Sequence, residues 1–334
     1  MIMRTDDLEY LRSVNFIEWK RFDGKAVYIT GATGLIGSNL VDAIRNCSNA
    51  KVIVQIRDLE KAQKLFGTSV EYVVCDLNDK SNYSGKVDYM IHCANPTSSI
   101  FFVNNPVETI STAVSGTLNA LKFANEKKVK GFVFLSTMEV YGMPEKGHKV
   151  SENEGGMFDT AIVRNCYPIS KQTCESLCVA YAAEYGVHTR VVRLTQTFGP
   201  GVSYNDGRVF AEFARCAIEK RNIVLKTEGK TERDYLYTVD AVSAILTVLL
   251  GGGDGEIYTA ANESTYCSIK QMAELVAQNY KVGVKYELQD TKDFGYAPTL
   301  YMNLDVSKLK SIGWKPQYGL LEMYIRMIED MTKQ

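Results

Sequence analysis

The sequence predicts an α/β fold: a doubly wound parallel sheet with a smaller C-terminal α/β lobe. Short apolar, β-rich runs alternate with helical patterns from residue 26 onward, and a glycine-rich turn joins the first run to the first helix. After Gly199-Pro200-Gly201 the elements become shorter and mixed. Apolar strands separated by helices indicate a parallel sheet covered on both faces, and the later change indicates the second lobe.

This alternation defines the expected elements. The predicted strands are Ala26–Thr30, Lys51–Ile56, Val70–Cys75, Val87–Cys93, Gly131–Thr137 and Thr189–Thr195. The predicted helices are Leu35–Asn46, Pro106–Lys127 and Pro168–Tyr185, then Phe210–Lys220, Val239–Leu250, Ser268–Tyr280 and Gly319–Met331 in the second lobe. Right-handed crossovers between parallel strands place the ligand crevice at the carboxyl ends of the strands.

The composition argues against several classes of protein. The 334 residues are 46% hydrophobic and 23% charged, and their net charge is −1, so no global field favours nucleic acid or an anionic membrane. No apolar run approaches the ~20 residues needed to cross a bilayer. The eight cysteines form no CxxC pair, and no cluster has metal-ligand spacing. We therefore expect a cytoplasmic protein with reduced thiols and no metal.

A glycine-rich loop, Thr-Gly-Ala-Thr-Gly-Leu-Ile-Gly at residues 30–37, follows the first strand and opens a helix. Gly31 allows the tight turn, Gly34 lets the backbone approach a pyrophosphate, and Gly37 permits close helix–strand packing. The N–H groups and partial positive charge of the helix N-terminus suit phosphates. At this position the loop predicts a Rossmann-type dinucleotide site. Its other expected contacts are Thr33, Leu35 and Ile36.

The end of the second strand should meet the adenosine ribose. An acidic residue there accepts the 2′-hydroxyl of NAD, whereas an arginine suits the 2′-phosphate of NADP. Arg57 precedes Asp58, and Lys61 follows one turn later, so NADP is favoured over NAD. Asp76, after the third strand, is expected either to take the adenine amino group or to cap a turn. The remaining cofactor positions are Leu77 and Ala94.

A phenol and an ammonium lie four residues apart in Tyr167-Pro168-Ile169-Ser170-Lys171, hence on one helix face. A phenol with a pKa of ~10 is a poor base at neutral pH, and a neighbouring cation favours its ionised form. Thr137 ends the fifth strand and can hydrogen-bond a substrate hydroxyl beside Tyr167. The group predicts hydride chemistry at a carbinol carbon.

Three segments follow along the chain. Residues 1–24 form a helical extension, 25–200 the dinucleotide-binding domain with the catalytic residues, and 201–334 a smaller substrate-binding lobe that interleaves with it. Leu8, Leu11, Val14 and Ile17 recur at helical spacing, which predicts a short helix packed on the domain near the cofactor. This segment contains several acidic residues among its apolar ones, which makes it unlike a signal peptide.

Six motifs occur in order along the chain: TGATGLIG, CDL, STMEVYG, YPISK, FGPG and RDYLYTVDA. In type and spacing they resemble the extended short-chain dehydrogenases, the NAD-dependent epimerase/dehydratase family of nucleotide-sugar enzymes. The resemblance runs from about Lys25 to Ile312–Pro316. It implies that Thr137, Tyr167 and Lys171 form the catalytic group and that Lys171 also holds the nicotinamide ribose. It also implies a homodimer built on the helices at 106–127 and 168–185.

The resemblance further implies a substrate with a nucleotide-linked sugar or polyol. Arg233 matches the family arginine that contacts the nucleotide; the alternative is a surface ion pair with Asp234 or Glu232. Gln196 falls where the family usually has an asparagine near the sugar phosphates. The other implied substrate positions are Asn95, Thr97, Arg208 and Val209.

Departures from the family bear on the reaction. The 4,6-dehydratases have Thr-Asp-Glu where this chain has Thr137-Met138-Glu139, and Met138 cannot protonate a departing hydroxyl. Strand alternation would put Glu139 on the face of Thr137, where it could remove a proton alpha to a transient ketone; the alternative is a surface carboxylate. Dehydratases and decarboxylases also carry a late arginine, about where Tyr301 or Met302 stands.

Four functions remain open. Epimerase/dehydratase chemistry through a transient ketone is the first, because Glu139 and the family's usual reactions favour internal redox. An NADPH-dependent reductase of a nucleotide-linked ketose or keto-sugar is the second, favoured by Arg57 and Met138. A nucleotide-sugar decarboxylase and a non-catalytic dinucleotide sensor are the others. Intact Thr137, Tyr167 and Lys171 argue against the sensor.

Overall fold

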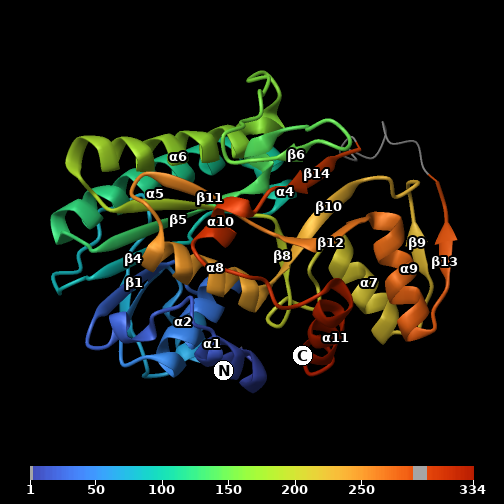
Figure 1. Cartoon of the computed structure of the whole chain (residues 1–334), viewed down its shortest axis with the longest axis horizontal. Helices are drawn as coiled ribbons and strands as arrows, with labels where there is room; N and C mark the ends of the chain where they lie inside the picture. The colour runs from blue at the N-terminus through green and yellow to red at the C-terminus, as the bar shows by residue number, and fades with distance from the viewer. Residues whose placement is uncertain (1–2, 289–298) are drawn as a thin grey trace.

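The computed structural model describes residues 3–288 and 299–334. Its main sheet has seven parallel strands in the order β11-β7-β5-β4-β1-β2-β3. Strands β11, β5, β4 and β1 of this sheet are labelled in Figure 1. The strands are β1 (Ala26–Thr30), β2 (Lys51–Ile56), β3 (Glu71–Val74), β4 (Tyr89–His92), β5 (Gly131–Thr137), β7 (Thr189–Leu194) and β11 (Glu256–Ala260). All six predicted strands are present, and β11 is an addition from the second half of the chain.

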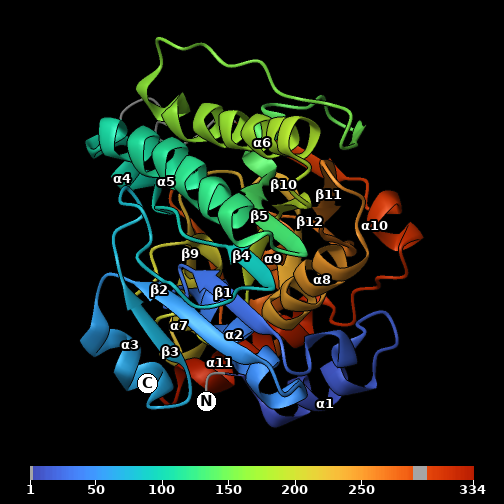
Figure 2. The ribbon, with the colours of Figure 1, turned by 90° about the vertical axis from the view of Figure 1, so that its left-hand side faces the viewer.

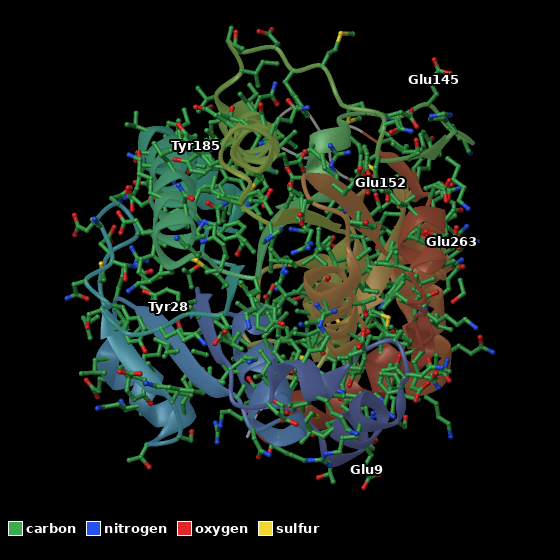
Figure 3. The ribbon with its side chains drawn as sticks, turned by 60° about the vertical axis from the view of Figure 1, so that its left-hand side comes forward. Glu9, Tyr28, Glu145, Glu152, Tyr185 and Glu263 are labelled. Atoms are coloured by element: carbon green, nitrogen blue, oxygen red, sulfur yellow. The ribbon has the colours of Figure 1, made fainter. Side chains whose placement is uncertain are left out.

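Helices cover both faces of this sheet (Figure 2). Helices α5 (Pro106–Lys127) and α6 (Cys166–Tyr185) pack on one face, and α2 (Leu35–Cys47) and α8 (Thr238–Gly251) pack on the other. Tyr28 of β1, labelled in Figure 3, belongs to the core between the sheet and helices α5 and α6. Its ring centroid lies 5.0 Å from that of Phe123 in α5. The predicted doubly wound architecture is confirmed.

Each central strand sends alternate side chains into two different cores. In β5, Val133 and Leu135 join the core beneath α2 and α8, whereas Phe132 and Phe134 join the core beneath α5 and α6. A strand buried on both faces needs an unbroken apolar run, which is the pattern that predicted it. The carboxyl ends of these strands therefore form one rigid edge, from which the loops of the site extend.

The second lobe contains a five-stranded sheet in the order β12-β10-β14-β6, with β8 paired to β10. Its strands are β6 (Lys149–Val150), β8 (Gln196–Phe198), β10 (Glu232–Tyr237), β12 (Asn262–Ser268) and β14 (Tyr301–Leu304). A separate pair joins β9 (Ile223–Leu225) to β13 (Val284–Tyr286). The lobe's helices are α7 (Val209–Ile218), α9 (Ile269–Tyr280), α10 (Ser307–Ser311) and α11 (Leu320–Met331).

The two parts of the chain interleave. Strands β6 and β8 leave the first part to join the second sheet, whereas α8 and β11 return from the second part to the main sheet. The short elements near the site are α3 (Leu59–Phe66), α4 (Ser99–Asn104), η2 (Met138–Tyr141) and η3 (Val163–Asn165).

The N-terminal helix α1 (Thr5–Ser13) buries Leu8 and Leu11, as their spacing predicts, but it ends at Ser13, so Val14 and Ile17 lie beyond the helix. It does not lie near the cofactor loop, so that part of the prediction is wrong. The Met3 amide donates to Asp42 and the Arg12 guanidinium donates to the Asn46 carbonyl, both toward the C-terminal end of α2. The phosphate loop is at the opposite end of α2, and the extension instead braces the helical layer.

Within residues 3–288 and 299–334, no helix is both long and apolar enough to span a membrane. The same residues contain no group of three or more His, Cys, Asp and Glu side chains placed to hold a metal.

Candidate active site

The glycine loop between β1 and α2 is shaped by two close backbone approaches. Gly31 has φ +67°, and a Cβ there would lie 2.6 Å from the Ala94 amide nitrogen. A Cβ on Gly37 would lie 2.3 Å from the Gly31 carbonyl oxygen. A side chain at either position would collide with main chain. The sequence assigned these glycines to a tight turn and to close packing, and the geometry agrees.

Gly34 differs from the other two glycines because its surroundings are open. A Cβ there would meet only the Gly31 oxygen, at 3.4 Å. Gly34 is exposed and is the N-cap of α2, where no side chain caps the helix. Thr33, Leu35 and Ile36 around it are half-buried. An uncapped helix N-terminus beside an open glycine fits a pyrophosphate, so the loop is compatible with a dinucleotide.

At the predicted adenosine end, Arg57 and Asp58 have different surroundings. The Arg57 side chain is 74% exposed, and its guanidinium lies 4.0 Å from a carboxylate oxygen of Asp76. Asp58 is the N-cap of α3 and accepts from the Lys61 amide at 2.9 Å. Asp76 also accepts from the Asn78 amide at 2.9 Å, which is the turn-capping role considered as its alternative. Arg57 is therefore the least engaged of the three groups.

The loop after β4 carries unpaired polar atoms. Ala94 packs against Gly31, and the amide and carbonyl ends of the Asn95 side chain are buried. Within the described part of the chain, neither Asn95 atom has a hydrogen-bond partner, and nor does the buried hydroxyl of Ser136 on β5. Unpaired buried polar groups are costly, and at the carboxyl ends of neighbouring strands these atoms are placed to bond a ligand. Thr97, two residues on, is exposed.

Tyr167 and Lys171 lie in the first two turns of α6, which packs beside β5. Both side chains are buried, with exposed fractions of 7% and 4%. The Lys171 Nζ donates to the Leu135 carbonyl at 2.8 Å and lies 4.5 Å from the Phe134 ring centroid. Burial lowers the pKa of Lys171 to about 8. A desolvated ammonium needs a strong acceptor, and the strand carbonyl supplies one.

The effect expected of Lys171 on the phenol is opposed by burial in this structure. Burial raises the pKa of Tyr167, and the negative charge of Glu139 acts in the same direction. A hydrogen bond involving Thr137 and the positive charge of Arg164 oppose this effect. No hydrogen bond joins Lys171 to Tyr167, both of which the structure describes.

Glu139 reaches the site by a different route from the one predicted. Strand β5 ends at Thr137 and the 3₁₀ turn η2 begins, so strand alternation does not apply; instead the Glu139 amide donates to the Thr137 hydroxyl at 3.2 Å. The Glu139 side chain is 35% exposed and pairs with Arg164 at 2.9 Å. Arg164, three residues before Tyr167, was not identified from the sequence, although a cation so close to the motif could have been noticed.

Met138 points away from solvent into a small apolar cluster. Its exposed fraction is 6%, and Met302 and Leu304 of β14 belong to the same cluster. Thr195 donates its hydroxyl to the Met138 sulfur at 3.3 Å. Met138, which replaces the family acid, and Met302, one of the two candidates for the late family arginine, thus contribute to one apolar cluster. No acid at residue 138 and no arginine at residue 301 or 302 is available here.

The implied nucleotide contacts fall into two sets. Arg233 of β10 donates to the Gln196 side-chain oxygen at 2.8 Å, and its Nε, within the described residues, has no partner. Among the described residues, Arg233 forms neither of the ion pairs considered as the alternative. Asp234 is buried and accepts from the Leu304 amide, and Glu232 faces Lys146.

Arg208 and Val209, the other implied substrate positions, lie at the start of α7. The exposed Arg208 guanidinium donates two hydrogen bonds to the Asp206 carboxylate, and Val209 is the first residue of α7.

A family model described as the NAD dependent epimerase/dehydratase family matches residues 27–261. This chain belongs to that family. UDP-glucuronic acid decarboxylase 6 of Arabidopsis thaliana is 31% identical over 312 residues, covering 91% of this chain and 88% of the relative. UDP-glucuronic acid decarboxylase 1 of Xenopus tropicalis is 31% identical over 327 residues, covering 96% and 75%.

Solved structures agree on the fold. The UDP-glucose 4-epimerase of Thermotoga maritima, solved with UDP-glucose, superimposes with a TM-score of 0.79 at 24% identity, covering 92% of this chain and 99% of that one. The dTDP-glucose 4,6-dehydratase of Bacillus anthracis, in complex with NAD, gives 0.76 at 19% identity, covering 93% and 97%. The resemblance drawn from the motifs is confirmed.

Proposed function

We propose that this family member is an NAD(P)-dependent nucleotide-sugar epimerase/dehydratase that acts through transient oxidation of a sugar carbinol to a ketone. The main support is the arrangement at one edge of the sheet. The open glycine loop after β1, the unpaired Asn95 after β4 and the buried Tyr167–Lys171 pair beside β5 all lie at the carboxyl ends of neighbouring parallel strands.

In this proposal the bound nicotinamide supplies the hydride acceptor and donor. Tyr167 carries the proton of the substrate hydroxyl, and Thr137 hydrogen-bonds the same oxygen. Lys171 holds the nicotinamide ribose and, when the cofactor's own positive charge is added, favours the ionised phenol. The burial of Tyr167 and Lys171 excludes water, which strengthens these charge interactions.

Glu139 is the proposed base for a proton alpha to the ketone. Its pairing with Arg164 keeps the carboxylate close to Tyr167, at an intermediate exposure. Loss of a leaving hydroxyl would lack the family acid, since residue 138 is a buried methionine. Among internal redox reactions, this favours epimerisation over 4,6-dehydration.

A nucleotide-sugar decarboxylase is the second candidate, because several relatives that match most of this chain are named UDP-glucuronic acid decarboxylases. The absence of an arginine at Tyr301 or Met302, about where the family carries one, counts against it.

For the cofactor, we propose NADP in preference to NAD. Arg57 is exposed at the end of β2 and Asp58 is engaged as a helix cap, so the cation is the freer group to meet a ribose 2′-substituent. The relatives solved with NAD are the reason to test this preference directly.

For the wider setting, we propose a homodimer and a cytoplasmic location. Helices α5 and α6 lie side by side on the outside of the sheet (Figure 2) and expose Val107, Ile110, Val179 and Tyr185. Exposed apolar side chains on two adjacent helices suit an isologous interface with a second copy. All eight cysteines are free, as in a reducing compartment.

Product analysis tests the proposed function. Purified protein is incubated with UDP-glucose, UDP-glucuronic acid, dTDP-glucose and their N-acetylated counterparts, with NAD or NADP, and the products are identified by mass and by chromatographic comparison with standards. An isomer of unchanged mass supports epimerisation, and loss of water supports dehydration. Loss of carbon dioxide establishes the decarboxylase instead, and consumption of NADPH in step with product establishes the reductase.

A further inference from the structure

Three side chains from three short segments form one connected unit with Tyr167. The Phe102 ring of α4 lies parallel to the Tyr167 ring, with centroids 4.1 Å apart and an interplanar angle of 8°. The Arg164 guanidinium of η3 lies 4.9 Å from the Phe102 ring centroid. Its Nη2 donates to Glu139 of η2 at 2.9 Å. Arg164 thus contacts an aromatic ring on one side and a carboxylate on the other.

This unit holds α4 in place together with the packing of α4 against α5. The helix has six residues, too few to be stable without tertiary contacts. Phe102 is its buried residue, with 1% exposure, whereas Ile100 and Val103 are 74% and 51% exposed. Besides the Phe102 stack, the helix is held by the Cys166 thiol, which donates to the Phe102 carbonyl, and by Arg164, which approaches the Ser99 hydroxyl at 3.5 Å. Helix α4 covers the Tyr167 ring through these contacts.

The same unit sets the charge around the phenol. Glu139 comes from η2, Arg164 from η3, and Cys166 and Lys171 from α6 itself, while α4 carries no titratable side chain. Glu139 raises the pKa of Tyr167 and Arg164 lowers it, each less strongly than burial does. Because the two side chains are paired, Arg164 opposes the effect of Glu139 on the phenol.

We propose that Arg164 is a positioning residue, which neutralises Glu139 and holds Phe102 flat against Tyr167. It thereby controls both the enclosure of the phenol and the pH at which the phenol gives up its proton. This inference rests on the proposed function for the role of Tyr167. Without Arg164, an unbalanced carboxylate would lie beside the phenol and α4 would lose its cation–π contact.

A set of charge variants tests the electrostatic part. The cofactor-loaded protein is mixed with UDP-glucose or UDP-glucuronic acid, and the rate of nicotinamide reduction in the first turnover is measured against pH. Arg164→Met should move the midpoint of the profile up by about one pH unit or more, since an uncompensated anion disfavours the phenolate. Glu139→Gln should move it down. Arg164→Lys, and the neutral pair Arg164→Met with Glu139→Gln, should stay near wild type.

Arg221→Met is the matched control, because it also removes an arginine that pairs with a carboxylate, Glu212, but after α7 rather than beside Tyr167. It should leave the midpoint unchanged. An Arg164→Met midpoint equal to that of wild type, or a double variant that shifts as far as Arg164→Met alone, would overturn the electrostatic role. A residue that only stabilises the fold would lower the rate without moving the midpoint.

Amide hydrogen exchange of residues 98–105 tests the holding of α4 without any substrate. Arg164→Met should accelerate exchange by roughly threefold or more, Arg164→Lys by less, and Arg221→Met not at all. Unchanged exchange in Arg164→Met would overturn the proposal even if no nucleotide sugar is turned over. A wild type that fails to reduce its cofactor with every sugar, yet shows the exchange pattern, counts against the proposed function alone.

Discussion

The ammonium of Lys171 is hydrogen-bonded to the main-chain carbonyl of Leu135, at 2.8 Å, inside the protein. The lysine is 4% exposed and its pKa is lowered to about 8, from an ordinary value of 10.5, chiefly by burial. The fold therefore holds a positive charge in the protein interior, where desolvation of the charge destabilises the folded state. A cost of this kind is typical of a functional site, where strain or desolvation is offset elsewhere in the structure.

Replacing this lysine should separate stability from activity. Lys171→Met removes the buried charge at similar volume, so the free energy of unfolding at pH 7 should rise by roughly 1–3 kcal/mol. Turnover should fall by ~100-fold or more, because the cofactor ribose loses its partner. Denaturant titration and steady-state assays measure the two effects.

The stability gain should depend on pH. Between pH 8 and 10.5 the unfolded chain holds the Lys171 proton and the folded wild type has lost it, so wild-type stability rises with pH in this window. The advantage of Lys171→Met should shrink accordingly. A variant that is less stable than wild type at pH 7 would mean that the bond to Leu135 outweighs the cost of burial.

Two glycines of the loop should respond differently to the same substitution. Gly34→Ala adds a Cβ whose nearest protein atom is 3.4 Å away, so the melting temperature should barely change while dinucleotide affinity drops at least ~10-fold. Gly37→Ala puts a Cβ 2.3 Å from a backbone oxygen and should cost about 1–3 kcal/mol of stability. Thermal unfolding and cofactor titration compare them. Full affinity in Gly34→Ala would argue against a pyrophosphate at this loop.

Arg57→Ala tests the preference between cofactors. Loss of a charge-assisted bond to the 2′-phosphate should weaken NADP by roughly 1.5–3 kcal/mol and leave NAD nearly unchanged. Lys64→Ala is a fair control, because the Lys64 and Arg57 side chains are both 74% exposed and both face a carboxylate. Calorimetric titration of both cofactors decides the point. If wild type binds NAD more tightly than NADP, the preference is wrong and Asp58 becomes the ribose ligand.

Glu139→Gln distinguishes chemistry at the neighbouring carbon from simple carbonyl reduction. The variant keeps size and hydrogen bonding but removes basicity, so hydride transfer should survive while product formation falls roughly 100-fold. Wild-type product made in deuterated water should carry deuterium on carbon. Inversion at the oxidised carbon needs no such base, so an active variant is also checked for net NADPH loss. Full activity, no carbon-bound deuterium and stoichiometric NADPH consumption would establish the reductase.

The sequence was informative wherever a local pattern has one structural solution. Strands buried on both faces read as unbroken apolar runs, and β1, β2 and β5 have the predicted bounds. The glycine loop was equally predictable, because Gly31 and Gly37 are required by backbone approaches that follow from a strand–turn–helix junction. These features depend on neighbours that are close in sequence or fixed by sheet order.

Other features depend on contacts between distant segments, which periodicity does not reveal. The Phe102–Tyr167 stack joins residues 65 positions apart and depends on how α4 packs against η3. The pairing of Arg164 with Glu139 follows from a 3₁₀ turn that replaces the expected strand alternation at Thr137. The helical spacing of Tyr167 and Lys171 likewise predicted their common face. It did not predict that the Lys171 ammonium donates to the Leu135 carbonyl.

The most direct test of the central claim is a single-turnover comparison of wild type with Tyr167→Phe. Each protein is loaded with cofactor and mixed with the nucleotide sugars named above, and the absorbance of reduced nicotinamide is followed. In wild type we expect a transient rise with no net change in cofactor. In Tyr167→Phe, cofactor binding should persist while the rise slows at least ~100-fold. A variant that oxidises the sugar at nearly the wild-type rate would contradict the account.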